Sequence, residues 1–197
     1  MPESSDPYTY PGTDVLRNIL GVHEPQRLDA FEANATAARL IELDAKPLAG
    51  QFDVAHFRAI HRHIFQDVYA WAGEFRTVNI SKGGQLFGVA AFIEPALREV
   101  LRRLCGEHCL RGLDVRKFTL HAGFYLGELN AIHPFRDGNG RVQREFIRQL
   151  AAQAAFLIDW GRVTREQMLA ASIESFKTGD SSGLAGLIER SLSPRDR

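Results

Sequence analysis

Hydrophobic residues recur three and four positions apart along most of the chain, the spacing that places them on one face of an α-helix. The pattern predicts a mostly helical protein, and 197 residues are enough for one compact unit with a sizeable core. Helices are expected over residues 14–20, 25–45, 91–109, 114–130, 139–156, 164–176 and 182–192, with one more beginning after Asp53.

Side chains that commonly cap helices stand at several expected helix starts. Thr13 precedes the first helix, which Gly21 would end. Asp53, Asp114 and Thr164 precede three later helices. The apolar stripe of the 25–45 helix is expected to be Leu28, Phe31, Ala35, Ala38 and Ile41. In the helix after Asp53 the stripe is Phe57, Ile60, Ile64 and Phe65, interleaved with His56, His61 and His63.

Residues 73–88 depart from the helical pattern. Residues 76–80 have the β-branched content of a strand, Lys82-Gly83-Gly84 is typical of a tight turn, and a second short extended piece can follow. A lone hairpin is marginally stable, so we expect this one to lie as a flap over a surface or cleft of the helical body. The predicted fold class is all-α with a small β-hairpin flap.

Composition argues against several classes of protein. The 24 Lys and Arg balance the 24 Asp and Glu, and a net charge of zero does not favour a nucleic-acid-binding protein held by phosphate attraction. The longest apolar runs, such as residues 89–93, are too short to span a bilayer, and the first 25 residues show no secretory signal pattern. We therefore expect a soluble, cytoplasmic protein without membrane contact.

Cys105 and Cys109 are the only cysteines, and His108 lies between them. A reducing compartment explains two free thiols four positions apart in a helical pattern. A metal site at this place would need two further ligands at useful spacing, and none is apparent in the sequence.

Residues 133–144, with the sequence HPFRDGNGRVQR, concentrate groups that suit phosphate chemistry. Gly138-Asn139-Gly140 stands before an expected helix, and backbone amides at a helix N-terminus bind anions well. Arg141 and Arg144 share a face of the first turns of that helix. Positive charge there opposes the helix dipole, so these arginines suit a bound phosphate better than an isolated helix.

Two further side chains complete the pattern. Asp137 is an oxygen ligand of the kind that Mg²⁺ prefers. A neutral His133 can accept a proton from a hydroxyl near pH 7, and Pro134 should hold it extended at the end of the preceding helix. Each of these residues alone is more often structural, and the glycines lack the strand–turn–helix context of a P-loop. Their complementary roles within twelve residues favour a magnesium–nucleotide site.

Residues 133–144 resemble the motif of the Fic (Fido) family, His-Pro-Phe-x-Asp/Glu-Gly-Asn-Gly-Arg-x-x-Arg, at every defined position. The resemblance extends to Glu128-Leu129-Asn130-Ala131-Ile132, to Trp71-Ala72-Gly73, and to Asp6-Pro7-Tyr8 and Tyr10-Pro11-Gly12 of cell-filamentation and toxin-like bacterial members. It implies a Fic-type helical bundle with the flap over the active site. It also implies a catalytic core at residues 51–197, with residues 1–50 as a helical extension packed on that core.

The resemblance further implies a protein adenylyltransferase, which transfers AMP from Mg-ATP to a Tyr, Thr or Ser hydroxyl of a target protein and releases pyrophosphate. His133 would be the general base, and Asp137 would bind Mg²⁺. The nucleotide would be bound by Asn130, Gly138, Asn139, Gly140, Arg141 and Arg144, with Lys82 and Gly83 at the tip of the flap. The flap, residues 78–87, would align the target segment by strand-like pairing.

Gly140 bears on the type of transfer. The related Doc kinases have lysine at this position and transfer the γ-phosphoryl group, so Gly140 favours nucleotidyl transfer. Two alternatives stay open. One is the same fold with another donor, such as GTP, UTP or a phosphocholine carrier. The other is a non-catalytic nucleotide-binding or protein-interaction module.

The sequence also suggests how such an enzyme is controlled. Many family members carry an inhibitory helix with the pattern Ser/Thr-x-x-x-Glu-Gly/Asn, whose glutamate pairs with the second motif arginine. No glutamate of this chain is followed by Gly or Asn. The resemblance therefore implies a toxin-like protein that a small antitoxin inhibits in trans near Arg144. Type II topoisomerase subunits are targets of some similar toxins, and they are the first candidates for the target here.

Overall fold

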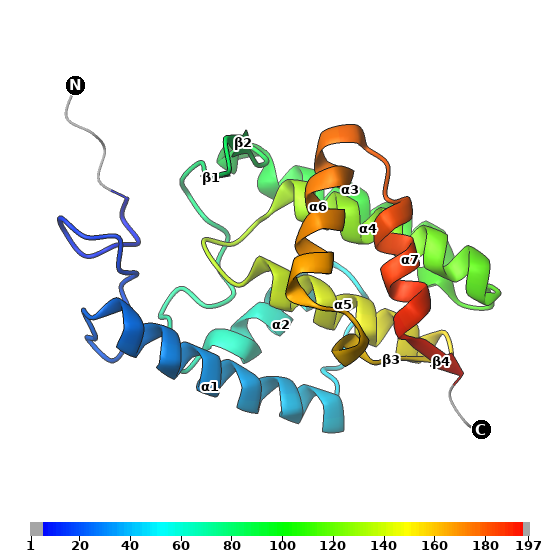
Figure 1. Cartoon of the computed structure of the whole chain (residues 1–197), viewed down its shortest axis with the longest axis horizontal. Coiled ribbons are helices and arrows are strands. Elements are labelled where there is room, and N and C mark those ends of the chain that lie inside the picture. Colours follow the sequence, from blue (N-terminus) through cyan, green and yellow to red (C-terminus); the bar gives the residue numbers. More distant parts are fainter. Residues whose placement is uncertain (1–5, 195–197) are drawn as a thin grey trace.

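The computed structural model describes residues 6–194, in which seven α-helices and two small sheets form the protein (Figure 1). The helices are α1 (Pro25–Ala45), α2 (Val54–Phe65), α3 (Ile93–Gly106), α4 (Val115–Ile132), α5 (Asn139–Gln153), α6 (Arg165–Thr178) and α7 (Ser182–Ser191). Single 3₁₀ turns are η1 (Ala90–Phe92), η2 (His108–Leu110) and η3 (Trp160–Arg162). The antiparallel sheets pair β1 (Ser81–Lys82) with β2 (Gln85–Leu86), and β3 (Phe156–Ile158) with β4 (Leu192–Pro194). The predicted fold class is confirmed.

The helices pack in succession across the molecule. At one edge α1 packs on α2, α2 packs on α5, α5 packs on α4, and α4 packs on both α3 and α7, while α6 lies against α4 and α7 (Figure 1). The predicted stripe of α2 lies in the core, because Phe57, Ile60, Ile64 and Phe65 are all fully buried. The core continues through Phe118, Tyr125 and Leu129 of α4 and Val142, Phe146 and Leu150 of α5.

Three predicted helix caps are present. The Asp53 carboxylate accepts a hydrogen bond from the backbone N–H of His56 at 2.8 Å, and Asp114 accepts one from Lys117 at 2.9 Å. Thr164 and the Gln167 side chain form a reciprocal capping box at the start of α6. These local signals fix where α2, α4 and α6 begin.

Helix α1 has the predicted bounds, but its inward face differs from the predicted stripe. Leu28, Thr36 and Leu43 are buried, whereas Phe31 and Ile41 are exposed. The inward face carries polar groups because they bind a side chain of α5, as described below. Apolar spacing therefore identified Leu28 and the partly buried Ala35 correctly, and it missed Thr36 and Leu43.

The helix expected at residues 14–20 is not formed. Leu16 instead pairs with Thr9 in an isolated antiparallel bridge, and the backbone N–H of Ile19 donates to the Val68 carbonyl at 2.9 Å. Hydrogen bonds to residues distant in the sequence thus replace the local bonds that a helix needs. Tertiary contacts override the weak local propensity of so short a segment.

The hairpin lies slightly later in the chain than expected. Ser81 pairs with Leu86, and the turn is made by Gly83 and Gly84, both with positive φ. Residues 76–80 do not form the predicted strand. Arg76 points into the protein, and its backbone N–H donates to the Pro134 carbonyl at 2.9 Å rather than to a partner strand.

Within residues 6–194 no helix combines the length and the apolar composition needed to cross a bilayer. Both cysteines are free thiols, with Cys105 exposed and Cys109 partly buried. No group of three or more His, Cys, Asp or Glu side chains gathers at metal-binding distance in the described part of the chain.

Candidate active site

A cleft of about 1110 Å³ opens between the flap, the loop that joins α4 to α5, the first turns of α5, and α6. It brings together every residue that the sequence predicted for the site: Asn130, His133, Asp137, Gly138, Asn139, Gly140, Arg141, Arg144, Lys82 and Gly83. The wall formed by η3 and α6 carries the apolar side chains of Trp160, Met168, Leu169, Ile173 and Phe176, with polar and charged residues (Thr164, Arg165, Ser172 and Lys177) among them. The cleft therefore has one phosphate-suited wall and one wall suited to a flat apolar group.

The loop before α5 is held rigidly. Phe135 is fully buried and stacks on His61, with ring centroids 3.8 Å apart. Gly138 has φ of 80° and caps α5, and a Cβ atom at this position would lie 2.2 Å from the Phe65 ring. Only glycine can therefore occupy this position without displacing the core of the protein.

Asn139 acts on the loop through its side chain. Its amide oxygen accepts from the Phe135 backbone N–H at 2.9 Å, and its amide nitrogen donates to the Phe135 carbonyl at 2.8 Å. Both polar atoms thus hold the loop, and Asn139 is only 3% exposed. Anion binding at this position falls to backbone amides of the first turn of α5, which have no partner within the helix.

His133 lies at the end of α4, and one of its ring nitrogens is hydrogen-bonded to a backbone carbonyl. Nδ1 lies 3.0 Å from the Asn130 carbonyl oxygen, so it carries the proton, and Nε2 is left as the acceptor. Burial lowers the pKa of His133 to about 4, and the Arg76 and Lys82 charges act in the same direction. The imidazole is therefore neutral at physiological pH.

The backbone of His133 is left-handed, with φ of 48°, rather than extended as Pro134 led us to expect. Its N–H donates to the Leu129 carbonyl at 3.1 Å and so closes the last turn of α4. This helix-capping bond outweighs the preference of a residue before proline. The ring then stacks on Phe87 of the flap, with centroids 3.9 Å apart.

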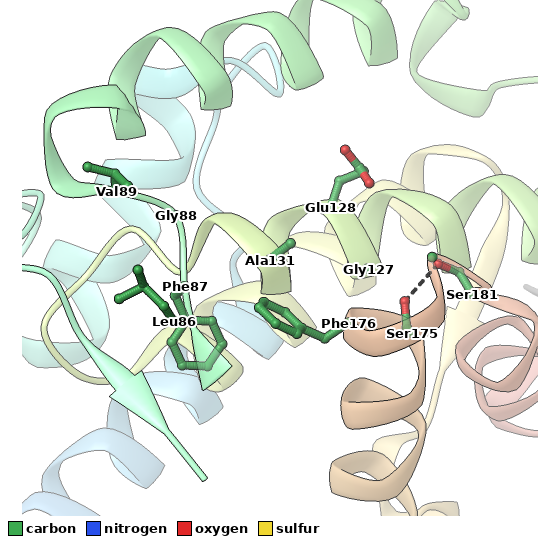
Figure 2. A pocket seen from close by; sticks show the side chains of 11 residues that line it. Leu86, Phe87, Gly88, Val89, Gly127, Glu128, Ala131, Ser175, Phe176 and Ser181 are labelled. Atoms are coloured by element: carbon green, nitrogen blue, oxygen red, sulfur yellow. Dashed lines mark hydrogen bonds between the residues drawn. The ribbon is translucent and has the colours of Figure 1, made fainter. Parts of the chain in front are cut away.

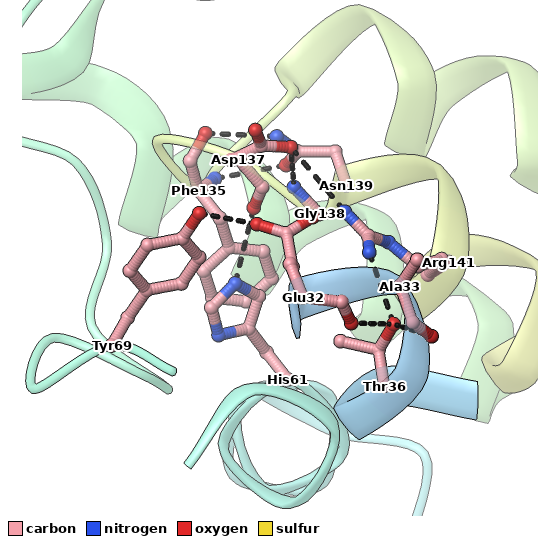
Figure 3. Close-up of polar contacts among 10 residues, drawn as sticks. All are labelled: Glu32, Ala33, Thr36, His61, Tyr69, Phe135, Asp137, Gly138, Asn139 and Arg141. Atoms are coloured by element: carbon pink, nitrogen blue, oxygen red, sulfur yellow. Dashed lines mark hydrogen bonds and ion pairs between the residues drawn. The ribbon is translucent and has the colours of Figure 1, made fainter. Parts of the chain in front are cut away.

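The two motif arginines have different surroundings. Arg141 points to α1, where its guanidinium forms an ion pair with Glu32 at 2.6 Å and donates to the Thr36 hydroxyl at 3.2 Å (Figure 3). The Tyr69 hydroxyl donates to the other carboxylate oxygen of Glu32. The guanidinium carbon also lies 4.5 Å from the centre of the Phe65 ring. Arg141 is thus already neutralised within the protein.

Arg144 has no such counter-charge. Within residues 6–194 no Asp or Glu forms an ion pair with its guanidinium. Burial, and next the Arg141 charge, lower the pKa of Arg144. One guanidinium nitrogen lies close to Gly140 at the start of α5. A partly buried cation beside free helix amides is an anion-binding arrangement.

His61 links the Asp137 loop to the body of the protein. Its Nδ1 accepts the Gly73 N–H at 2.8 Å, so its Nε2 carries the proton and donates to the Asp137 carbonyl at 3.1 Å (Figure 3). Burial lowers the pKa of His61 to about 3. The Asp137 side chain is about half exposed and lines the cleft; its Oδ1 accepts the Gly138 N–H and lies 3.7 Å from the Arg141 guanidinium, so the other carboxylate oxygen is left for Mg²⁺ that is also bound by phosphates.

A second, smaller cavity of about 480 Å³ lies behind the flap (Figure 2). Phe87 and Phe176 line both cavities and contact each other edge to face at 5.5 Å, so they form the wall between them. Glu128 and Ala131 of α4 also line the second cavity. Any movement of the flap therefore changes the shape of both cavities.

Sequence reasoning missed the residues that hold the site in place. Glu32, Thr36 and Tyr69 surround Arg141, and they are scattered over two segments with no motif to mark them. His61 gave one signal, since a histidine on the apolar face of α2 must find buried partners. Arg76 gave none, because a lone arginine normally lies on the surface.

Comparison with known proteins agrees with this geometry. Residues 51–151 match the model of the Fic/DOC family. Protein adenylyltransferase VbhT of Bartonella schoenbuchensis is 46% identical over 189 residues, which are 96% of this chain and 39% of that protein. The chain thus spans about two fifths of the length of VbhT. The probable protein adenylyltransferase y4lH of Sinorhizobium fredii is 40% identical over 188 residues, which are 95% of this chain and 96% of that protein.

A solved structure shows the same fold. The N-terminal Fic domain of a cell filamentation protein from Bartonella quintana, determined with bound ADP, superposes with a TM-score of 0.92 at 30% identity, covering 96% of this chain and 95% of that one. The chain belongs to the Fic/DOC family.

Proposed function

We propose that this chain is a protein adenylyltransferase, a nucleotidyltransferase that transfers AMP from ATP to a hydroxyl side chain of a target protein and releases pyrophosphate. The observation that carries the proposal is the content of the cleft. A neutral His133, the Asp137 carboxylate, the free amides of α5 and the uncompensated Arg144 cation all line one cavity. The Fic domain structure with ADP and the relatives named adenylyltransferases support the same activity.

The phosphates occupy the wall formed by α5. Backbone amides of Asn139 and Gly140 bind the α- and β-phosphates, with Gly138, whose N–H donates to the Asp137 carboxylate, beside them, and Arg144 holds the outer phosphate. Asp137 would hold Mg²⁺, which neutralises charge on the phosphate oxygens when it is bound. Arg141 contributes charge at longer range, because its donors are directed to Glu32 and Thr36.

The base in this reaction is Nε2 of His133. It takes the proton of the target hydroxyl while the hydroxyl oxygen forms its bond to the α-phosphorus and the bond to pyrophosphate breaks. The hydrogen bond from Nδ1 to the Asn130 carbonyl holds the ring in the tautomer that leaves Nε2 free. Most of the rate enhancement comes from orienting the hydroxyl in line with the leaving group.

The target segment lies along the flap, where the edges of the two short strands offer backbone groups to an extended chain. Lys82 and Gly83 at the turn lie beside the nucleotide. Gly140 leaves space beside Arg144 for a phosphate, because a Cβ atom here would lie 3.3 Å from Arg144 Nη1. A type II topoisomerase subunit is the first target to test.

Control of the enzyme follows from the free Arg144. We infer that the chain acts as a toxin and that a small antitoxin inhibits it by presenting a carboxylate to Arg144, since none of its own glutamates does so among the described residues. Co-expression with candidate small proteins should abolish AMP transfer. If no partner carboxylate lowers transfer by the wild-type chain, this part of the proposal is wrong.

The donor is tested by incubating the protein with a bacterial lysate and α-labelled ATP, GTP or UTP in parallel. We expect protein-bound label from ATP above the other two. Equal or greater protein-bound label from GTP or UTP would show that ATP is not the preferred donor, while the type of reaction would stay the same. No protein-bound label from any of them, with nucleotide still bound, would leave only a non-catalytic binding module.

A further inference from the structure

Arg76 is buried in the centre of the junction between the flap and the catalytic loop. Its side chain is 2% exposed. Within the described part of the chain no carboxylate pairs with it, and burial lowers the pKa of Arg76. A buried guanidinium without an ionic partner is costly unless its donors are satisfied by hydrogen bonds. Hydrogen bonds rather than an ion pair must therefore stabilise Arg76 at this position.

The donors of Arg76 are satisfied by backbone carbonyls from two sides of the junction. On the flap side Nη1 donates to Val78 at 2.7 Å and Nη2 donates to Gly88. On the catalytic side Nε donates to His133 at 2.8 Å and Nη2 also reaches Ile132 at 3.2 Å. Both ends of the flap and the end of α4 are thus held by one planar group.

Two backbone hydrogen bonds reinforce the same junction. The Arg76 N–H donates to the Pro134 carbonyl at 2.9 Å, and the Gly88 N–H donates to the Ala131 carbonyl at 3.0 Å. Gly88 comes so close to α4 that a Cβ atom there would lie 3.0 Å from the Ile132 oxygen (Figure 2). The flap therefore begins and ends at fixed points on the backbone that carries His133.

We propose that Arg76 is a positioning residue of the transfer reaction, which sets the flap in register with His133 by clamping both flap ends to residues 132–134. The inference rests on the proposed function, because a target hydroxyl aligned by the flap must arrive at Nε2 of His133. Small errors in such alignment cost a large part of the rate. The phosphates are bound by α5 and not by the residues that Arg76 holds, so most of the nucleotide affinity should survive loss of the clamp.

The test compares Arg76→Met and Arg76→Lys with the control Arg58→Met. Arg58 also donates to a backbone carbonyl, that of Gly73 at 2.7 Å, and pairs with Glu74, so it is bound outside the flap junction. Three quantities are measured for each protein: amide hydrogen exchange of Phe87 and Gly88, the Kd for ATP, and transfer of α-label from ATP to lysate proteins.

In Arg76→Met we expect exchange at Phe87 and Gly88 to rise about tenfold or more and transfer to fall about tenfold or more, because the flap opens locally and alignment is lost. The Kd for ATP should change by less than about threefold, since the phosphate wall is intact. Arg76→Lys should restore only part of the effect, because an ammonium group cannot bind four carbonyls in one plane. Arg58→Met should resemble the wild type.

The inference is overturned if flap exchange is unchanged in Arg76→Met, or if exchange rises equally throughout α4 and α5. Should Arg76→Met fail to fold, Gly88→Ala disturbs the same junction while keeping the charge. That variant must then show the same loosening of the flap and the same loss of transfer, and normal transfer in it would equally refute the clamp. Exchange needs no substrate, so a wild-type protein that transfers no label refutes the proposed function, while flap exchange still decides the clamp.

Discussion

At the scale of single residues, the protonation state of His133 is the property on which the chemistry depends. The ring is partly buried, lies near the Arg76 and Lys82 charges and is hydrogen-bonded through Nδ1. These surroundings keep it in the neutral form, which is the form that accepts a proton. A histidine at an exposed position would be partly protonated near pH 6 and would lose activity there.

The pH profile of kcat/KM tests this property. With the pKa of His133 lowered to about 4, transfer should be nearly constant from pH 7 down to pH 5 and fall with an acid limb near pH 4. Circular dichroism at each pH controls for unfolding. A half-maximal rate near pH 6.5 would show that the ring is not shielded as the structure indicates.

The two motif arginines should separate into a structural and a binding role. Arg141→Ala leaves Glu32 partly buried without its partner, so the free energy of unfolding should fall by about 2 kcal/mol. Arg144→Ala removes a cation that has no ion-pair partner in the described structure, so stability should be nearly unchanged while the KM for ATP rises about tenfold or more. Urea unfolding and ATP-dependent kinetics measure the two effects, and identical behaviour of both variants would refute the distinction.

At the scale of elements, the site is a junction of α4, α5 and α2 rather than a single loop. The 133–144 motif supplies the end of α4 and the start of α5, while His61 of α2 holds the Asp137 carbonyl from below (Figure 3). A second hydrogen bond, which the Gly73 N–H donates to Nδ1 of His61, fixes the ring. Helix α2 therefore couples the loop to the segment that leads to the flap.

The pH dependence of stability should report this coupling. Because the pKa of His61 is lowered to about 3 in the folded protein, the unfolded chain binds a proton at this residue below about pH 6.5 that the folded protein does not bind. Its contribution to stability is therefore complete above pH 6.5 and is lost as the pH falls toward 3, by at most about 1.4 kcal/mol per pH unit.

Urea midpoints between pH 7 and pH 4 measure this slope. His61→Gln should unfold more easily at pH 7 and should show a shallower loss of stability on acidification than the wild type. The control is His63→Gln on the same helix, where the side chain is 23% exposed and contacts Glu42 rather than the loop. Equal slopes for His61→Gln and the wild type would contradict the buried, neutral state of His61.

At the scale of the whole molecule, periodicity and caps were sufficient to predict the helical body. Helix α1 and the starts of α2, α4 and α6 follow from spacing and from the caps Asp53, Asp114 and Thr164. The motif was sufficient to find the cleft, because all of its chemical groups are local in sequence. The predictions that were wrong concern segments whose structure depends on residues distant in the sequence. Residues 14–20 form hydrogen bonds with other segments instead of a helix. Residues 76–80 form no strand, because Arg76 is buried and is bound to the backbone at the end of α4.

The inward face of α1 shows the same limit. Its partly buried Glu32 and buried Thr36 contact Arg141, which lies more than a hundred positions later in the chain. Nothing in the local pattern of α1 marks this contact. Buried polar networks of this kind join segments that only the fold brings together, so they are visible in the structure and not in the sequence.

Transfer of AMP in the cleft, with His133 as the base, is the proposal on which the other functional predictions depend. The most direct measurement incubates the wild type and His133→Ala with a bacterial lysate and ATP labelled at either the α or the γ phosphate. We predict protein-bound label from the α position alone, with a loss of at least about a hundredfold in His133→Ala while ATP binding is retained. Protein-bound γ label would contradict AMP transfer, and α label that persists in His133→Ala would contradict the role of His133 as the base.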